Sequence, residues 1–523
     1  MTRPRRVAVV AAVVVALGAA AAFAVTQPFR RKPIAVAIAG LDEGALVGRA
    51  ELAHLDVAVT ATGSDVRAVR VFVDGQPVPA RGNGDPSFVY RLRNLSDGHH
   101  EFVVSVEGPD APLRAVRSFS VDTRPPLLAV TRPRRPVDIK AAVTLTGRVE
   151  TGATLRVGGK PLRAPGGRFR VRFPRPPAQV PLVATDAAGN ATTRVLTVPV
   201  RHPGMRAIHV TAFAWATPSL RSGVVRLIRE HRVDAVELDI KDESGIVGYD
   251  SHVPLARRIG AVRRIYDIRK AVAQLHAMHV RVVGRIVAFR DPVLATAAWR
   301  SGSRDQVIQA PNGSPYNSKY GGFTNFANPV VRRYNIDLAV EAARAGFDDI
   351  LYDYIRRPDG PIATMRFPAL RGTPEQSIVT FTAESRGRLR PLGTYVGVSV
   401  FGVAATRPHE VAQDIPQLAR YADYIAPMLY PSHWARGEYG VSDPNRQPFD
   451  IVARSLKDFL SDVRGTNAAV IPWLQDFSLG VSYGPVQVLE QIRAARSVGI
   501  PNFLLWDPAV TYTVGALQPQ ARR

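Results

Sequence analysis

Acidic and aromatic residues stand at the ends of short apolar segments from about residue 204 onward, and the most prominent of them are Asp239, Asp353, Trp473, Asp476 and Trp506. Two carboxyl groups can flank a glycosidic bond, one protonating the leaving oxygen and the other stabilising or attacking the anomeric carbon. Flat aromatic rings stack on the apolar faces of sugar rings. This combination predicts chemistry on carbohydrates, with Asp353 and Asp476 as the carboxyl pair and Asp239 as a further catalytic candidate.

A second set of residues is expected to bind the substrate because these side chains also follow the apolar segments. The set is Lys241, Asp242, Arg356, Tyr430, His433, Trp473, Trp506 and Asp507. The spacing does not decide which carboxyl group is the acid, because that choice needs a distance between them.

Each of these residues also has a structural interpretation. An aspartate at the end of a strand can cap a helix or form an ion pair, and Arg356 or Arg357 could neutralise Asp353. The two tryptophans could pack at a rim. Strict alternation along a strand would turn Asp239 and Lys241 to the same side.

Other reaction classes lack their residues. The chain has no cysteine, which excludes thiolate ligands, cysteine nucleophiles and disulfides. No H-x-H or H-E-x-x-H pattern occurs, so metal-dependent chemistry is disfavoured, and we do not expect serine hydrolase chemistry either. We therefore expect neither a metal ion nor a cofactor.

The elements that must position these residues begin at about Gly204, where strand-like segments alternate with amphipathic helical ones. Eight candidate strands lie at Ala207 to Phe213, Ala235 to Asp242, Val280 to Phe289, Gly346 to Pro358, Tyr395 to Val403, Asp423 to Pro431, Ala468 to Phe477 and Asn502 to Pro508. Eight strands with intervening helices predict an α/β fold, a closed (β/α)8 TIM barrel over residues 204–517, whose active site lies at the carboxyl ends of the strands. An open doubly wound sheet is the alternative, but no glycine-rich phosphate turn follows the first strand.

The barrel is preceded by a β-like region. Short alternating segments separated by Gly, Pro, Asn and Asp predict two small all-β sandwiches, at residues 33–123 and 124–203. Each contains a similar hairpin, VFVDGQPV at Val71 to Val78 and LRVGGKPL at Leu155 to Leu162, with the dipeptides that favour type I′ turns. We expect these sandwiches to act as spacers, with carbohydrate or partner binding as the alternative.

Residues 1–32 have the composition of an export signal. MTRPRR precedes an uncharged apolar segment, Val7 to Val25, and Arg30, Arg31 and Lys32 follow it. This order is typical of a signal peptide, and the segment is also long enough to remain as a membrane anchor. Either alternative predicts that the rest of the chain works in the cell envelope or outside the cell.

The net charge of +24 is spread along the 523 residues and supplied mainly by arginine. No nucleic-acid-binding module accompanies it, so we expect no nucleic-acid partner. A solvated surface explains the charge, and adhesion to an anionic envelope is the alternative.

The motifs of the predicted barrel resemble a bacterial family of predicted glycoside hydrolases, often described only as a TIM-barrel domain of unknown function. The similar segments are Val236 to Ser251, Gly284 to Pro292, Asn328 to Pro358, Tyr424 to Trp434 and Pro472 to Phe477. The second sandwich resembles bacterial immunoglobulin-like modules in its hairpin and in the phrase ATDAAGNATTRVLTV. The resemblance implies a glycosidase acting on an extracellular or envelope polysaccharide, with functional residues at Asp239, Asp242, Asp353 and Arg356, in Tyr430 to His433, and in Trp473 to Asp476.

The chain departs from the family pattern in its fifth strand. Members of the family tend to carry an acidic residue just before V-F-G, where this chain has Ser399. A serine at that position motivates a second hypothesis, a non-catalytic glycan-binding or scaffold protein of the envelope.

Overall fold

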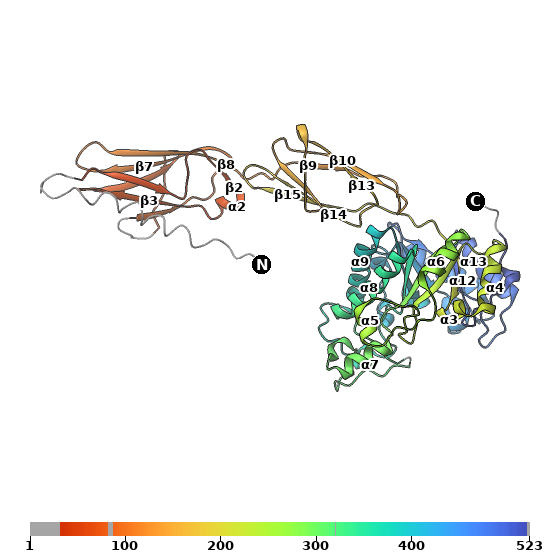
Figure 1. Ribbon diagram of the computed structural model, residues 1–523. Coiled ribbons are helices and arrows are strands. Elements are labelled where there is room, and N and C mark those ends of the chain that lie inside the picture. The colour runs from red at the N-terminus through yellow and green to blue at the C-terminus, as the bar shows by residue number, and fades with distance from the viewer. Residues whose placement is uncertain (1–31, 82–86, 320, 520–523) are drawn as a thin grey trace. The chain divides into compact units, whose positions relative to one another are not determined.

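The computed structural model describes residues 32–81, 87–319 and 321–519 (Figure 1). The predicted signal or anchor at residues 1–32 lies outside the described residues except for Lys32. Within the described ranges, no helix is both long and apolar enough to cross a membrane. The chain separates into two compact units. One contains the described residues up to Ala129 with Arg148–Phe169 and Leu182–Arg194, and the other contains Val130–Gly147, Arg170–Pro181 and the residues from Val195 onward.

The first β-rich region forms two sheets. A five-stranded sheet has the order β2-β8-β7-β4-β5, and a three-stranded sheet has the order β1-β3-β6. Alternate residues of these strands, such as Val57, Phe102 and Phe119, form a buried core. The bounds are β1 Ala35–Ala39, β2 Ala45–Gly48, α2 Arg49–Leu52, β3 Asp56–Thr62, β4 Ala68–Val73, β5 Gln76–Pro77, β6 Ser87–Arg91, β7 Gly98–Glu107 and β8 Leu113–Asp122.

Two further all-β sheets follow, with orders β13-β10-β9 and β12-β11-β14-β15. Both predicted hairpins have positive φ at their two central residues, as a type I′ turn requires: 49° and 76° at Asp74 and Gly75, and 57° and 79° at Gly158 and Gly159. The bounds are β9 Leu128–Thr131, β10 Val143–Val149, β11 Thr154–Val157, β12 Lys160–Leu162, β13 Arg168–Phe173, β14 Val180–Thr185 and β15 Ala191–Leu196. The prediction of all-β modules before the barrel is therefore confirmed.

The C-terminal region is a closed parallel barrel of eight strands, which confirms the predicted fold class. The hydrogen-bonded order is β20-β19-β18-β17-β16-β24-β23-β21-β22, and β20 also pairs with β21 to close the ring. The seventh strand is divided into β22 and β23 on either side of Ile471 and Pro472. The bounds are β16 Arg206–Val210, β17 Ala235–Lys241, β18 Arg281–Val287, β19 Asp349–Asp353, β20 Tyr395–Phe401, β21 Tyr424–Met428, β22 Ala469–Val470, β23 Trp473–Gln475 and β24 Phe503–Trp506.

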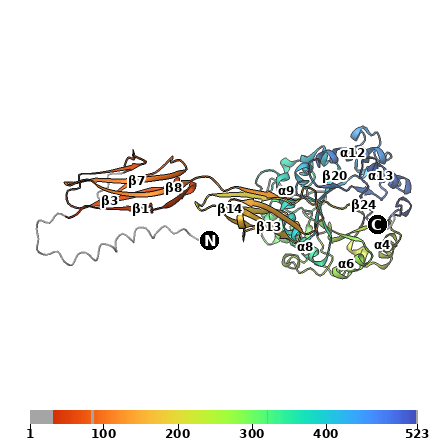
Figure 2. The same ribbon diagram turned by 90° about the horizontal axis from the view of Figure 1, so that it is seen from above.

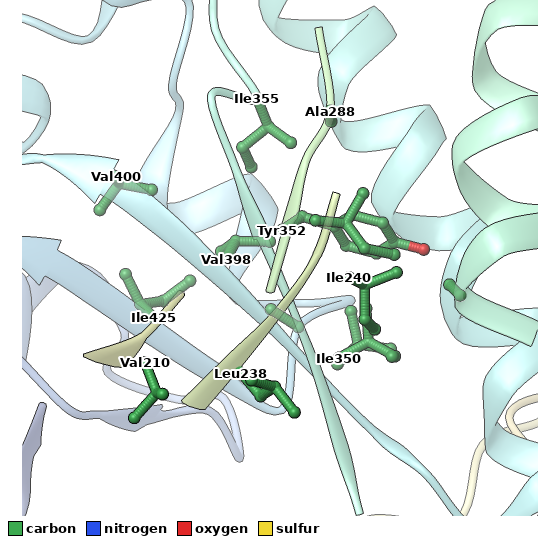
Figure 3. Close-up of a cluster of buried hydrophobic side chains, with 14 of the residues drawn as sticks. Val210, Leu238, Ile240, Ala288, Ile350, Tyr352, Ile355, Val398, Val400 and Ile425 are labelled. Atoms are coloured by element: carbon green, nitrogen blue, oxygen red, sulfur yellow. The ribbon is translucent and has the colours of Figure 1, made fainter. Parts of the chain in front are cut away.

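Helices surround the strands (Figure 2). Because both faces of the sheet are covered, the strands are almost entirely buried, as in β17, where all seven residues are. Figure 3 shows part of the apolar layer, with Leu238, Ile350 and Val398 among its residues. The helices are α3 Ala212–Ala216, α4 Pro218–Arg229, α5 Pro254–Arg258, α6 Ile268–Ala277, α7 Pro292–Arg300, α8 Pro329–Ala345, α9 Pro374–Leu389, α10 Pro408–Val411, α11 Ile415–Leu418, α12 Pro448–Asp462 and α13 Pro485–Ser497.

The segment around β19 shows how the sequence delivers Asp353 to one end of the barrel. The Asn328 side chain caps α8 by accepting from the Val330 backbone N–H at 2.8 Å. Gly346, with φ of 113°, ends that helix in the left-handed conformation that favours glycine. Asp349 then begins β19 and accepts from Arg281 at 2.9 Å, while Asp353 ends the strand at the opposite, carboxyl end.

Candidate functional site

A pocket of about 300 Å³ lies at the carboxyl ends of the barrel strands. Its two acidic lining residues are Asp353 and Glu243, and Arg285 lies beside them. Five predicted site residues line it: Asp353, Tyr430, His433, Trp473 and Trp506. The remaining lining residues are Tyr354, Phe401, Gly402, Val403, Met428, Trp434 and Phe477.

Arg285 of β18 joins the acidic residues into one cluster. Its Nη2 donates to Oδ2 of Asp353 at 2.7 Å and also to Oε1 of Glu243, while Nη1 donates to Oδ1 of Asp239 at 2.9 Å. The guanidinium is only 1% exposed. Because β17, β18 and β19 are neighbouring parallel strands, their carboxyl ends bring these side chains together.

Protons are unevenly distributed over this cluster. Burial raises the pKa of Asp239 to about 7 and the pKa of Glu237 well above its ordinary value, although Arg285 opposes both shifts. Burial also acts to raise the pKa of Glu243, but the charge and hydrogen bond of Arg285 outweigh it and lower that pKa to about 2. Near neutral pH, the proton is therefore held on the barrel-interior acids and not on Glu243.

His209 of β16 lies beneath the cluster. Its Nδ1 is hydrogen-bonded to Glu237, and its ring stacks on Trp506 at 4.0 Å between centroids. Burial lowers the pKa of His209 to about 4, so the ring is neutral at neutral pH.

His209, Glu237 and Asp239 offer three ligand atoms within 4.8 Å of one another, the spacing that a metal ion needs. Arg285 already donates to Asp239 and lies 3.7 Å from Glu237. The positive guanidinium disfavours a second cation at the same carboxyl groups, so the trio fits a hydrogen-bonded cluster better than a metal site.

Aromatic rings form much of the pocket wall. Trp473 is 2% exposed and meets Trp506 edge to face, with centroids 5.6 Å apart at 82°. The Arg285 guanidinium lies over the ring of Trp506, 4.9 Å from the ring centroid. Tyr430 meets His433 at 5.5 Å. Trp473 therefore closes the floor, and the other rings offer apolar surface to a ligand.

Tyr354 directs the Asp353 carboxyl group. Its φ is 50°, which is unfavourable for a residue with a side chain, and its backbone N–H donates to Oδ1 of Asp353 at 2.7 Å. The Tyr354 hydroxyl accepts from Arg290 at 3.2 Å. Strained backbone of this kind concentrates at functional sites because the surrounding structure must maintain it.

Two predicted acids lie away from the pocket lining. Both carboxyl oxygens of Asp476 accept from Thr513, through its backbone N–H at 2.9 Å and through its hydroxyl. Asp507 accepts from the Thr511 backbone N–H at 2.7 Å. Burial raises the pKa of Asp476 to about 6. Here both side chains shape the loop after β24.

Three further predicted residues support the pocket from outside. A register shift between Asp239 and Lys241 interrupts the alternation of β17, and Lys241 pairs with Asp291 at 2.6 Å. Asp242 accepts from the Ile246 backbone N–H at 2.9 Å and so closes the turn that contains Glu243. Arg356 stacks 4.4 Å from the ring of Phe401. Lys241 and Asp239 consequently face different sides, contrary to the expectation from alternation.

Glu243 and Arg285 were not among the predicted site residues. Glu243 lies in a turn behind β17, where no periodicity marks it. Arg285 follows the strand-end pattern and could have been found by the requirement that buried carboxylates have a cationic partner.

Residues 207–512 match the sequence family described as "Putative glycosyl hydrolase domain". No curated protein sequence matches the chain significantly. A solved hypothetical protein from Ruminiclostridium thermocellum is 30% identical, with 36% of this chain and 96% of that chain covered and a TM-score of 0.33. The PgaB (BpsB) glycoside hydrolase domain from Bordetella bronchiseptica is 16% identical, with coverages of 61% and 100% and a TM-score of 0.45. An α-galactosidase from Thermus thermophilus is 12% identical, with coverages of 80% and 78% and a TM-score of 0.38.

Proposed function

We propose that this chain, which belongs to the family described as "Putative glycosyl hydrolase domain", hydrolyses glycosidic bonds in an extracellular or cell-envelope polysaccharide. The observation that carries the proposal is the pocket in which Asp353 and Glu243 share the guanidinium of Arg285 beside aromatic walls. The location outside the cytoplasm rests on the sequence of residues 1–32.

Asp353 and Glu243 are the proposed carboxyl pair. One oxygen of each accepts from the same Nη2 of Arg285. Two hydrogen bonds to one nitrogen keep these oxygens within roughly 6 Å of each other, which suits carboxyl groups that flank a glycosidic bond. Glu243 takes the role predicted for Asp476, whose oxygens are both engaged by Thr513.

Glu243 is the proposed proton donor. It lies on a loop with its side chain 30% exposed, and Arg285 holds it ionised in the free protein. A sugar that displaces the bond to Arg285 leaves burial as the dominant influence, which raises the pKa of Glu243 and lets it carry the proton for the leaving oxygen.

Asp353 is the proposed nucleophile or stabiliser of the positive charge that develops at the anomeric carbon. Its carboxyl group is oriented by Arg285 on one side and by the Tyr354 backbone on the other. Asp239, with its pKa of about 7, keeps a proton for much of the time at neutral pH. Because the protonated Asp239 is neutral, it interacts only weakly with the positive charge of Arg285. That charge remains available to Asp353 and Glu243, which face the pocket.

The test is product release from a panel of polysaccharides by the wild type, Asp353→Asn and Glu243→Gln. We expect each substitution to lower kcat by at least about 100-fold, because each removes a group acting directly on the reacting bond. Asp450→Asn is the matched control, since Asp450 lies on α12 and pairs with Arg454. Unchanged release by both pocket variants would contradict the proposed pair.

A non-catalytic glycan-binding or scaffold role is the second candidate. It is favoured by Ser399 at the position where the resemblance implies an acid, and by the engagement of Asp239, Glu243 and Asp353 with one arginine. Polysaccharide binding by the wild type without release of any product would support this role and reject hydrolysis.

A further inference from the structure

We propose that Ser399 is a positioning residue whose hydroxyl fixes the indole of Trp473 and so sets the floor of the pocket. Its effect on substrate rests on the proposed function, whereas the contact itself does not. Ser399 thus has a function of its own in the site, the orientation of Trp473, at the position where the resemblance implies an acid.

The contact is direct and buried. Nε1 of Trp473 donates to Oγ of Ser399 at 3.0 Å, and the two residues are 2% and 1% exposed. A buried indole N–H needs an acceptor, because leaving it without one carries the full cost of removing it from water. The hydroxyl therefore selects one orientation of a ring that could otherwise turn about its side-chain bonds.

Ser399 is itself held rigidly near the carboxyl end of β20, two residues before Phe401. The buried side chain of Gln413 donates to the carbonyl oxygens of Ser399 and Ile355, both at 3.3 Å, and accepts from the Phe401 backbone N–H at 2.9 Å. Gln413 thus ties the ends of β19 and β20 together. An acceptor placed on a fixed backbone can orient its partner with little freedom.

The orientation of Trp473 matters because other rings pack against it. Its indole meets Trp506 edge to face at 5.6 Å, and the ring of Trp506 is stacked on His209 and lies 4.9 Å from Arg285. A rotation of Trp473 would therefore change the depth of the pocket and disturb Trp506, while the bonds from Arg285 to the acids do not pass through Ser399.

The experiment is a double-mutant cycle on the full chain with Ser399→Ala and Trp473→Phe, assayed on hexasaccharides of chitin, cellulose and xylan. We expect Ser399→Ala to raise KM by about three- to tenfold, the loss of one hydrogen bond, with little change in kcat. In the Trp473→Phe background, which lacks the indole N–H, the same change should add nothing to KM. An additive effect would overturn the proposal.

Two further variants separate this role from others. Ser455→Ala removes a buried hydroxyl of α12 that donates to the Ile451 carbonyl at 2.7 Å, and it should leave KM unchanged. Ser399→Asp restores an acid at the position, and we expect no gain in kcat. A rise in kcat above tenfold would show that the position belongs to a catalytic acid and would overturn the proposal.

If no hexasaccharide is cleaved, that result counts against the proposed function and not against the contact between Ser399 and Trp473. The contact can then be tested by a measurement that needs no substrate. The chain has five tryptophans, so their indole N–H signals can be followed by nitrogen-15 NMR, with Trp473 assigned through Trp473→Phe. Ser399→Ala should shift the Trp473 signal more than the other four. An unchanged Trp473 signal would overturn the proposal.

Discussion

At the scale of single residues, one guanidinium serves three acids. Arg285 donates to Asp239, Glu243 and Asp353, which lie on one strand end, one loop and another strand end. A planar group with five N–H donors can do this, whereas a lysine ammonium offers a single point of charge. The protonation of Asp239 and of Glu243 therefore depends on how the Arg285 charge is shared within the cluster.

The elevated pKa of Asp239 makes a prediction about stability. A pKa of about 7 in the folded protein, against 3.8 ordinarily, means that the folded state holds a proton that the unfolded state has released. The stabilisation from this protonated group is fully present below about pH 4 and is lost as the pH rises through about 7.

Asp239→Asn keeps an uncharged side chain at all pH values and should escape that loss. As the pH rises from about 4 to about 8, we expect the free energy of unfolding of Asp239→Asn to increase relative to that of the wild type by on the order of 2–4 kcal/mol. Urea unfolding of both proteins across this range measures the difference, with Asp450→Asn as the control. Parallel curves for Asp239→Asn and the wild type would refute the elevated pKa.

Much of the pocket could be predicted from residue types at strand ends. Asp353, Trp473 and Trp506 follow directly from that rule, and all three line the pocket. Asp476 also lies at a strand end, but its carboxylate accepts a hydrogen bond from Thr513. Residue type and strand position predict which end of the barrel a side chain occupies, but not which group it contacts. Glu243 was not predicted because it lies in a turn, where the hydrophobic pattern has no periodicity.

At the scale of elements, the eight strands were predicted because a parallel sheet buried on both faces produces nearly continuous apolar segments. The local irregularities of these strands were not predicted. The seventh strand is divided at Pro472, which has no backbone N–H to donate. The register shift in β17 turns Lys241 away from Asp239, and no Gly or Pro in that strand signals it.

Lys241 allows a prediction at this scale. It is fully buried, pairs with Asp291 at 2.6 Å and lies 4.9 Å from the ring of Tyr334 in α8. Lys241→Met leaves the Asp291 charge buried without its partner, and we expect a loss of about 3–5 kcal/mol in the free energy of unfolding. Lys457→Met, at an exposed position of α12, is the control.

Chemical denaturation and steady-state kinetics together decide the role of Lys241. The folded variant should keep the KM of the wild type, because the ammonium group faces α8. A raised KM with unchanged stability would instead support the substrate-binding role predicted from the sequence.

At the scale of the whole molecule, the order of an all-β region followed by a TIM barrel was predictable, since periodicity changes from two to the helical period near Gly204. The predicted boundaries between the β-rich modules stay predictions, as does the export signal.

We propose that the β-rich modules are spacers, which predicts that the barrel alone performs the reaction. A fragment of residues 124–523, which lacks the first β-rich module and keeps every residue of the compact unit that contains the barrel, should cleave soluble oligosaccharides with the kcat of the full chain. Pull-down on insoluble polysaccharide tests the alternative that the modules bind sugar: a fragment that keeps kcat but loses retention on the polymer would assign carbohydrate binding to the removed residues.

The register shift in β17 has a consequence for how such a barrel can change over evolution. Because it lies between Asp239 and Lys241, the two side chains occupy different compartments, one beside Arg285 and one against α8. Loss of the Ile240 codon would remove the shift and make Asp239 and Lys241 adjacent residues of a regular strand, which also point to opposite sides. The two side chains would therefore keep their compartments, so the acid beside Arg285 is insulated from a change of chain length at this point of the strand.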